Sequence, residues 1–147
     1  MTKAIYFDMD GTIANLYGVE NWLDHLQARQ TKPYREAAAM VDMRKLGKVL
    51  NLLQNQGYVI GIVSWLCKNS TQEYDIKVRE TKINWLKRHI GAVDWNEIHI
   101  VEYGTPKETV VNFPLGILFD DETRNRENWL GQAFDVHNIL EVLEELL

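Results

Sequence analysis

The sequence predicts an α/β fold of three layers, in which helices cover both faces of a doubly wound, mainly parallel sheet. Apolar runs of strand length alternate along the chain with longer segments whose apolar residues recur every three or four positions. The strand-like runs are apolar on both faces, as in strands buried within a parallel sheet. We therefore expect one domain covering residues 1–147, with the strand order 3-2-1-4-5.

Two strands and two helices are expected in the first half of the chain. The first strand covers residues 4–7 and ends at a pair of aspartates. A short helix is expected over residues 19–29 and a longer one over residues 35–55, because apolar residues fall at helical spacing in both. Gly57 is suited to end the longer helix, since glycine readily adopts a left-handed conformation. The second strand follows over residues 58–64.

The second half continues the same alternation. A third helix is expected over residues 72–89, where Tyr74 and Trp85 mark the inner face. Asn138 and Glu141 resemble a capping pair at the start of the last helix. The other expected elements are strands at 98–101, 115–119 and 133–136, a loop or single helical turn at 124–131, and a final helix at 139–147.

Polar groups stand where three of the expected strands end. Asp8 and Asp10 follow the first strand, Ser64 the second, and Asp120 and Asp121 the fourth. In a doubly wound sheet, ligands bind outside the carboxyl ends of the strands where the winding reverses. Four carboxylates in one crevice would repel each other, and a hard divalent cation such as Mg²⁺ would offset that repulsion.

Further residues fit a site for a phosphoryl group. Gly11 permits a tight turn after the first strand, and Thr12 adds a hydroxyl. Lys107, on the turn before the fourth strand, can reach the same crevice and balance phosphate charge. With Ser64 and the backbone N–H groups near Gly11, it would surround three phosphoryl oxygens. This set of groups suits attack by an aspartate on phosphorus, giving an aspartyl-phosphate that water hydrolyses.

The motifs and their order resemble the haloacid-dehalogenase-like (HAD) superfamily of aspartate-nucleophile phosphotransferases. The hydrophobic strand followed by residues 8–12 (DMDGT) resembles the family's first motif, Ser64 the second, Lys107 the third, and residues 119–121 (FDD) the fourth. The four motifs occur in the family's order across most of the chain. The resemblance implies a Rossmann-like core and a Mg²⁺-dependent phosphatase.

The resemblance also implies a role for each matching residue. Asp8 would be the nucleophile and a metal ligand, and Asp10 the general acid and base, with its backbone carbonyl on the metal. Thr12 would steady Asp10 and the loop. The remaining implied roles are phosphate binding by Gly11, Thr12, Ser64 and Lys107, and metal binding by Asp120 and Asp121 besides Asp8 and Asp10.

A second, local resemblance concerns the substrate. Residues 106–111 together with 118–121 resemble the 5'(3')-deoxyribonucleotidase branch of that superfamily, which implies a nucleoside monophosphate as substrate. That branch carries a sizeable helical cap after the first strand. Here residues 13–34 have room for a very small helical cap or flap only, so an open site that accepts a larger phosphorylated substrate is the alternative.

Several single residues have more than one interpretation. Lys68 and Lys82 are rivals to Lys107 for the place beside the nucleophile. Trp22 and Trp65 could stack on a substrate base, although aromatic residues more commonly pack in a core. An isolated aspartate at a strand end commonly caps a turn; the spacing DxDGT with a distant acid pair favours the catalytic interpretation.

Composition bounds the partners. A formal net charge of -5 argues against nonspecific nucleic-acid binding, which needs a basic face, so we expect a small phosphorylated substrate. The single cysteine, Cys67, fits a reducing cytoplasm, and we expect neither a signal peptide nor a membrane span. The oligomeric state stays open. Alternatives to an enzyme are a phosphoacceptor signalling domain, whose residue order differs, and a catalytically silent phosphate-binding module.

Overall fold

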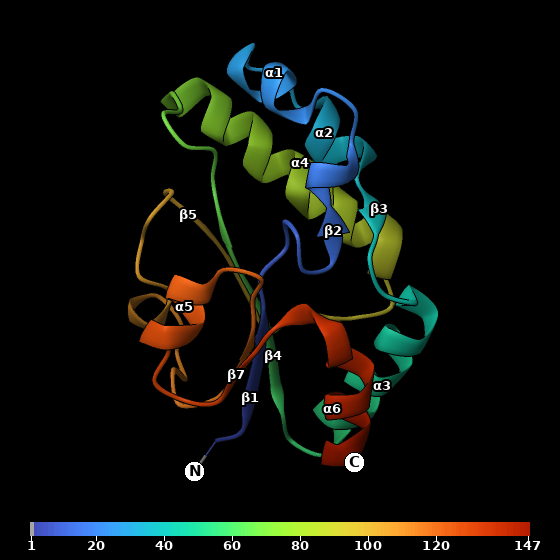
Figure 1. Ribbon diagram of the computed structural model, residues 1–147. Helices are drawn as coiled ribbons and strands as arrows, with labels where there is room; N and C mark the ends of the chain where they lie inside the picture. The colour runs from blue at the N-terminus through green and yellow to red at the C-terminus, as the bar shows by residue number, and fades with distance from the viewer. Residues whose placement is uncertain (1) are drawn as a thin grey trace.

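The computed structural model describes residues 2–147, and its central feature is one sheet of five parallel strands (Figure 1). The spatial order is β5-β4-β1-β6-β7. Numbered among themselves along the chain, these strands have the order 3-2-1-4-5, so the predicted fold class and strand order are confirmed. The strands are β1 (Ala4–Phe7), β4 (Val59–Trp65), β5 (Glu97–Val101), β6 (Ile117–Phe119) and β7 (Ala133–Phe134).

Helices lie on both faces of the sheet, as three layers require. One face packs on α3 (Met43–Asn55), α4 (Gln72–Ile90) and α6 (Ile139–Leu146), and its strand residues include Phe7 in the largest core cluster. The other face, which includes Tyr6, packs against Val111 and Trp129. These two residues follow the 3₁₀ helix η2 (Lys107–Thr109) and α5 (Thr123–Asn128) in the chain, and α5 stands apart from α3 and α6 in Figure 1.

The prediction of one long helix over residues 35–55 is wrong for its first part. The chain forms a short helix α2 (Lys32–Glu36), then the strand β3 (Ala38–Ala39), before α3 begins. Pro33 stands in the first turn of α2, where its missing N–H is no loss. Asp42 caps α3, because its side chain accepts a hydrogen bond from the Lys45 backbone N–H at 3.2 Å. That cap fixes the start of α3.

The excursion between β1 and α3 is a small two-helix insertion. Strand β2 (Ala14–Asn15) pairs antiparallel with β3, and η1 (Leu16–Gly18), α1 (Trp22–Gln27) and α2 lie between them. Figure 1 shows α1 near the amino-terminal part of α4 and α2 alongside the middle of that helix. The insertion packs on the rest of the chain in one apolar cluster. The buried residues of this cluster are Leu16, Leu26, Tyr34, Leu66, Tyr74, Val78 and Ile100. Assignment of this insertion as a cap stays a prediction.

The carboxyl-terminal helix begins at Ile139 as expected, but the predicted capping pair is wrong. The side chain of Asn138 makes no capping hydrogen bond. The chain instead enters α6 through the 3₁₀ helix η3 (Val136–Asn138), where Asp135 accepts from the Val136 N–H at 2.7 Å.

Among the described residues, none of the helices combines the length and the apolar character that crossing a membrane requires.

Candidate active site

A tight turn directly after β1 presents Asp8 and Asp10 at the carboxyl edge of the sheet. The Met9 carbonyl accepts hydrogen bonds from the three backbone N–H groups of residues 12–14, at 2.9 to 3.0 Å. Gly11 has a φ of 78°, and a side chain there would collide with Asp121. Glycine is therefore required at this position, because it adopts positive φ without strain and leaves room for the second acid pair.

Asp8 is held on both carboxylate oxygens. The Lys107 ammonium donates to Oδ1 at 2.9 Å, and the Thr12 hydroxyl donates to Oδ2 at 3.0 Å. Lys107, from η2, also donates to Asp120 Oδ2 at 2.7 Å and is only 2% exposed. Its third N–H has no hydrogen-bond partner among residues 2–147. This lysine therefore fixes the positions of two carboxylates and keeps one donor for a ligand.

Three carboxylates converge closely enough to hold a metal ion. One oxygen from each of Asp8, Asp120 and Asp121 lies within 4.8 Å of the other two. Asp120 is oriented by the Glu122 N–H at 2.9 Å and by the Asn125 side-chain amide at 3.1 Å. A set of hard carboxylate oxygens is the kind of site that Mg²⁺ occupies. The residues present therefore fit the predicted cation.

The ionisation of these acids reflects a shortage of positive charge. Burial, followed by the Asp8 carboxylate, raises the pKa of Asp121 to about 8 and that of Asp120 to about 6. Burial also raises the pKa of Asp10. For Lys107 burial acts to lower the pKa, but the carboxylates of Asp8 and Asp120 outweigh it and raise the pKa. A bound cation would favour the ionised form of all the acids.

Lys82 is a functional side chain that the sequence placed only among the rivals to Lys107. It projects from the middle of α4, is 1% exposed, and donates to Asp10 Oδ2 and Ser64 Oγ, each at 2.8 Å. A third bond goes to the Trp65 carbonyl at 2.7 Å. Both lysines thus reach the site. The sequence signal that could have placed Lys82 at the site is its spacing, because it lies four residues after Val78 on the inner face of the helix.

The other predicted site residues also lie at this edge, with differences of detail. Thr12 donates to Asp8 and accepts from the Asp121 N–H at 3.2 Å, whereas contact with Asp10 had been expected. The N–H groups of Gly11 and Thr12 donate to backbone carbonyls within the turn. Ser64 is fully buried beneath Lys82. Phosphate binding by these residues stays a prediction.

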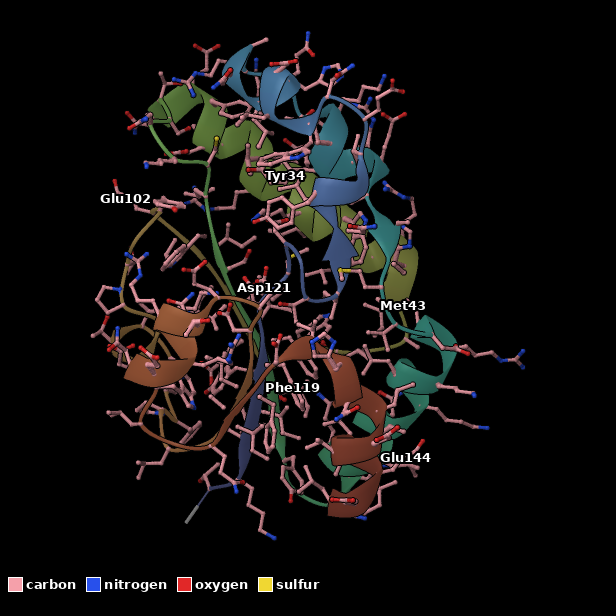
Figure 2. The ribbon with its side chains drawn as sticks, viewed as in Figure 1. Tyr34, Met43, Glu102, Phe119, Asp121 and Glu144 are labelled. Carbon is pink, nitrogen blue, oxygen red and sulfur yellow. The ribbon has the colours of Figure 1, made fainter. Side chains whose placement is uncertain are left out.

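A cavity of about 420 Å³ opens above the acids. Asp121, after β6, and Tyr34, from the insertion, both line it and are marked in Figure 2. Two pairs of aromatic rings line it. The ring centroids of Trp65 and Tyr103 lie 4.9 Å apart, and those of Tyr17 and Trp22 in the insertion lie 4.9 Å apart as well. The aromatic residues that line it are Tyr17, Trp22, Tyr34, Trp65 and Tyr103.

The comparisons with known proteins give likenesses to solved structures only. No family model matches the chain, and no curated protein matches it. Among solved structures, the chain is similar to the D,D-heptose 1,7-bisphosphate phosphatase from Burkholderia thailandensis, with a TM-score of 0.49 and 14% sequence identity. The alignment covers 86% of this chain and 70% of that chain.

Proposed function

We propose that this chain is a Mg²⁺-dependent phosphomonoester hydrolase of the HAD type, acting through an aspartyl-phosphate. The observation that carries the proposal is the bridge made by Lys107 between Asp8 and Asp120, beside the converging carboxylates. An ionised carboxylate held by two donors at the end of a buried strand is a suitable nucleophile. The order of the four motifs along the sequence is consistent with the same chemistry.

Asp8, Asp120 and Asp121 would hold Mg²⁺, together with the backbone carbonyl of Asp10. When bound, the ion would supply positive charge against the nucleophile and the phosphoryl oxygens, which repel each other in its absence. In the starting state, with Asp10 protonated, three ionised carboxylates face two ammonium groups, and the phosphate of the substrate adds negative charge of its own. A divalent cation would offset that excess.

In the first half-reaction, an oxygen of Asp8 attacks phosphorus and the bond between phosphorus and the leaving oxygen breaks. The protonated Asp10 carboxyl gives its proton to the leaving oxygen, which departs as an alcohol. Lys107 uses its remaining N–H on a phosphoryl oxygen. This donor stabilises the charge that develops on the phosphoryl group, whereas the Ser64 hydroxyl lies fully buried beneath Lys82.

In the second half-reaction, water attacks the phosphorus of the aspartyl-phosphate. Its proton passes to the Asp10 carboxylate, the bond between Asp8 and phosphorus breaks, and inorganic phosphate leaves. The site returns to its starting state, with Asp8 ionised and Asp10 protonated. Asp10 thus serves first as the general acid and then as the general base, while Asp8 is the nucleophile.

The aromatic mouth of the cavity supports a substrate with a flat leaving group, such as a nucleoside monophosphate. Trp22 and Trp65, for which packing in a core was the more common interpretation, both line the cavity. The volume of about 420 Å³ is within the range of small-molecule sites. Aromatic side chains around a polar floor would stack a base while its phosphate reaches Asp8.

The test is phosphate release from a panel of phosphomonoesters, nucleotides included, with Mg²⁺ and with chelator. We expect metal-dependent release by the native chain and none by Asp8→Asn. Absence of release from every substrate would contradict the proposal. Stable phosphorylation of the native chain without turnover would instead favour the phosphoacceptor domain, and binding of phosphate without either would favour the silent module.

A further inference from the structure

We propose that Lys82 is a positioning residue for leaving-group departure: it fixes Asp10 and Ser64 relative to each other and to the phosphoryl group. This inference rests on the proposed function and deepens it. The contacts are direct, because one ammonium group bonds Asp10 Oδ2 and Ser64 Oγ at the same distance of 2.8 Å. Three elements meet there: the turn after β1, the end of β4 and the middle of α4.

The donor count distinguishes Lys82 from Lys107. A lysine ammonium has three N–H donors. Those of Lys82 are all used, on Asp10, Ser64 and the Trp65 carbonyl. Lys107 uses two, on Asp8 and Asp120. Lys82 therefore has no donor left for substrate, and its effect on the reaction passes through its two side-chain partners.

Lys82 leaves one oxygen of Asp10 open to the cavity. Asp10 is 17% exposed at its side chain and lines the cavity, and Oδ1 accepts no hydrogen bond from residues 2–147. With Oδ2 held by Lys82, Oδ1 is the oxygen available to exchange a proton with the leaving group. Ser64 Oγ accepts from Lys82 and is fully buried, so the lysine ties the turn after β1 to the end of β4 beneath the cavity.

Stability alone does not account for Lys82. A buried ion pair contributes little net stability compared with apolar side chains of similar volume. The lysine is nonetheless almost completely buried, with the ring of Tyr34 from the insertion 5.0 Å from its ammonium. Its stem lies on the inner face of α4, where an apolar residue would otherwise be expected.

The experiment compares two substrates that need different amounts of proton transfer. p-Nitrophenyl phosphate has a good leaving group that departs without much protonation, whereas an alkyl phosphate requires a general acid. We expect Lys82→Met to lower kcat by about 100-fold on the alkyl phosphate and by less than about tenfold on the aryl phosphate. Lys82→Arg should recover part of the loss, and Lys77→Met, an exposed position on the same helix, should change neither.

A second variant keeps the proposal testable if Lys82→Met does not fold. In the double variant with Asp10→Asn both charges are removed together, and its kcat is compared with that of Asp10→Asn alone. We expect the two to differ by less than about tenfold on the alkyl phosphate, because only the part of the Lys82 effect that passes through Ser64 remains. An equal loss on both substrates, or a full additional loss in the Asp10→Asn background, would overturn the role. A native chain inactive on every substrate would instead overturn the proposed function.

Discussion

Two polar clusters within residues 2–147 differ in how far hydrogen bonds and opposite charges compensate their buried carboxylates. The Glu97 cluster consists of Tyr6, Glu97 and His99. The Tyr6 hydroxyl donates to Glu97 Oε2 at 2.7 Å, His99 lies 2.7 Å from Oε1, and the Asn112 N–H reaches Oε1 at 3.1 Å. Burial acts to raise the pKa of Glu97, but these hydrogen bonds outweigh it and lower the pKa.

The site cluster consists of Asp8, Asp10, Asp120 and Asp121 with Lys82 and Lys107. Here the pKa of Asp120 and of Asp121 moves upward, because burial and neighbouring carboxylates are not fully offset. One cluster is complete within the chain, and the other has room for more positive charge. Incomplete compensation of buried charge is the feature that makes the site cluster a candidate for binding a ligand, whereas burial of charge alone, as at Glu97, does not.

The largest expected effect is that of Asp8→Asn. The change should lower phosphate release by at least about 1000-fold, because it removes the nucleophile. It should leave the melting temperature unchanged or higher, because it removes one negative charge from a crowded acidic site. Steady-state kinetics and thermal unfolding provide the two readings, with Asp94→Asn on the exposed surface as the matched control. A clear drop in melting temperature would contradict the description of the site as over-charged.

Lys107→Met tests the opposite change in the same cluster. Removing this buried ammonium leaves Asp8 and Asp120 without their shared partner, and we expect a loss of about 3–5 kcal/mol in the free energy of unfolding without Mg²⁺. Urea unfolding in chelator measures it, with Lys77→Met as control. Mg²⁺ should restore part of the loss, because it would bind the same carboxylates. Unchanged stability would show that the lysine is not needed to balance the acids.

Mg²⁺ itself should stabilise the native chain. At free Mg²⁺ about 100-fold above its dissociation constant, linkage gives about 2.7 kcal/mol, which is read as a rise in melting temperature. Asp121→Asn should remove most of that rise, whereas Glu97→Gln should keep it, because the Glu97 cluster needs no cation. An equal rise in both variants would mean that the ion acts by general screening.

Glu97→Gln should have the smallest effect and a distinct pH dependence. Since the folded pKa of Glu97 is lowered, its carboxylate contributes stability above the pKa of the unfolded side chain, and this is lost as pH falls through the folded value. We expect a loss of about 1–3 kcal/mol at pH 7 that shrinks below about pH 4. Urea unfolding across that range, with Glu102→Gln as the exposed control, measures it; a difference that is independent of pH would contradict the assignment.

Much of the fold and part of the site could be predicted from the sequence. Strand order and the convergence of Asp8, Ser64 and Asp120 follow from apolar runs that end in polar groups, because parallel strands present their carboxyl ends at one edge. The spacing of apolar residues does not show the break before α3, because it does not reveal that Pro33 stands in the first turn of a separate short helix.

The contacts of Lys82, which the sequence offers only as a rival to Lys107, and of Glu97, which it does not single out, depend on tertiary geometry. Lys82 meets Asp10 only because of the way α4 packs against the sheet, which its own spacing does not specify. Glu97 meets Tyr6 across Gly61, which pairs with both in the sheet. A side chain at Gly61 would lie within 2.7 Å of the Tyr6 ring, so this contact depends on strand register together with a glycine.

The helix α4 contacts both the insertion and the site. The Tyr74 hydroxyl donates to the Gln30 carbonyl and the Trp85 indole to the Ala37 carbonyl, at 2.7 and 2.8 Å, while Lys82 between them bonds Asp10. An engineer who exchanged the insertion would therefore disturb the helix that holds Asp10, the proposed proton donor. On the proposed function, substrate choice and turnover in this scaffold have to be redesigned together.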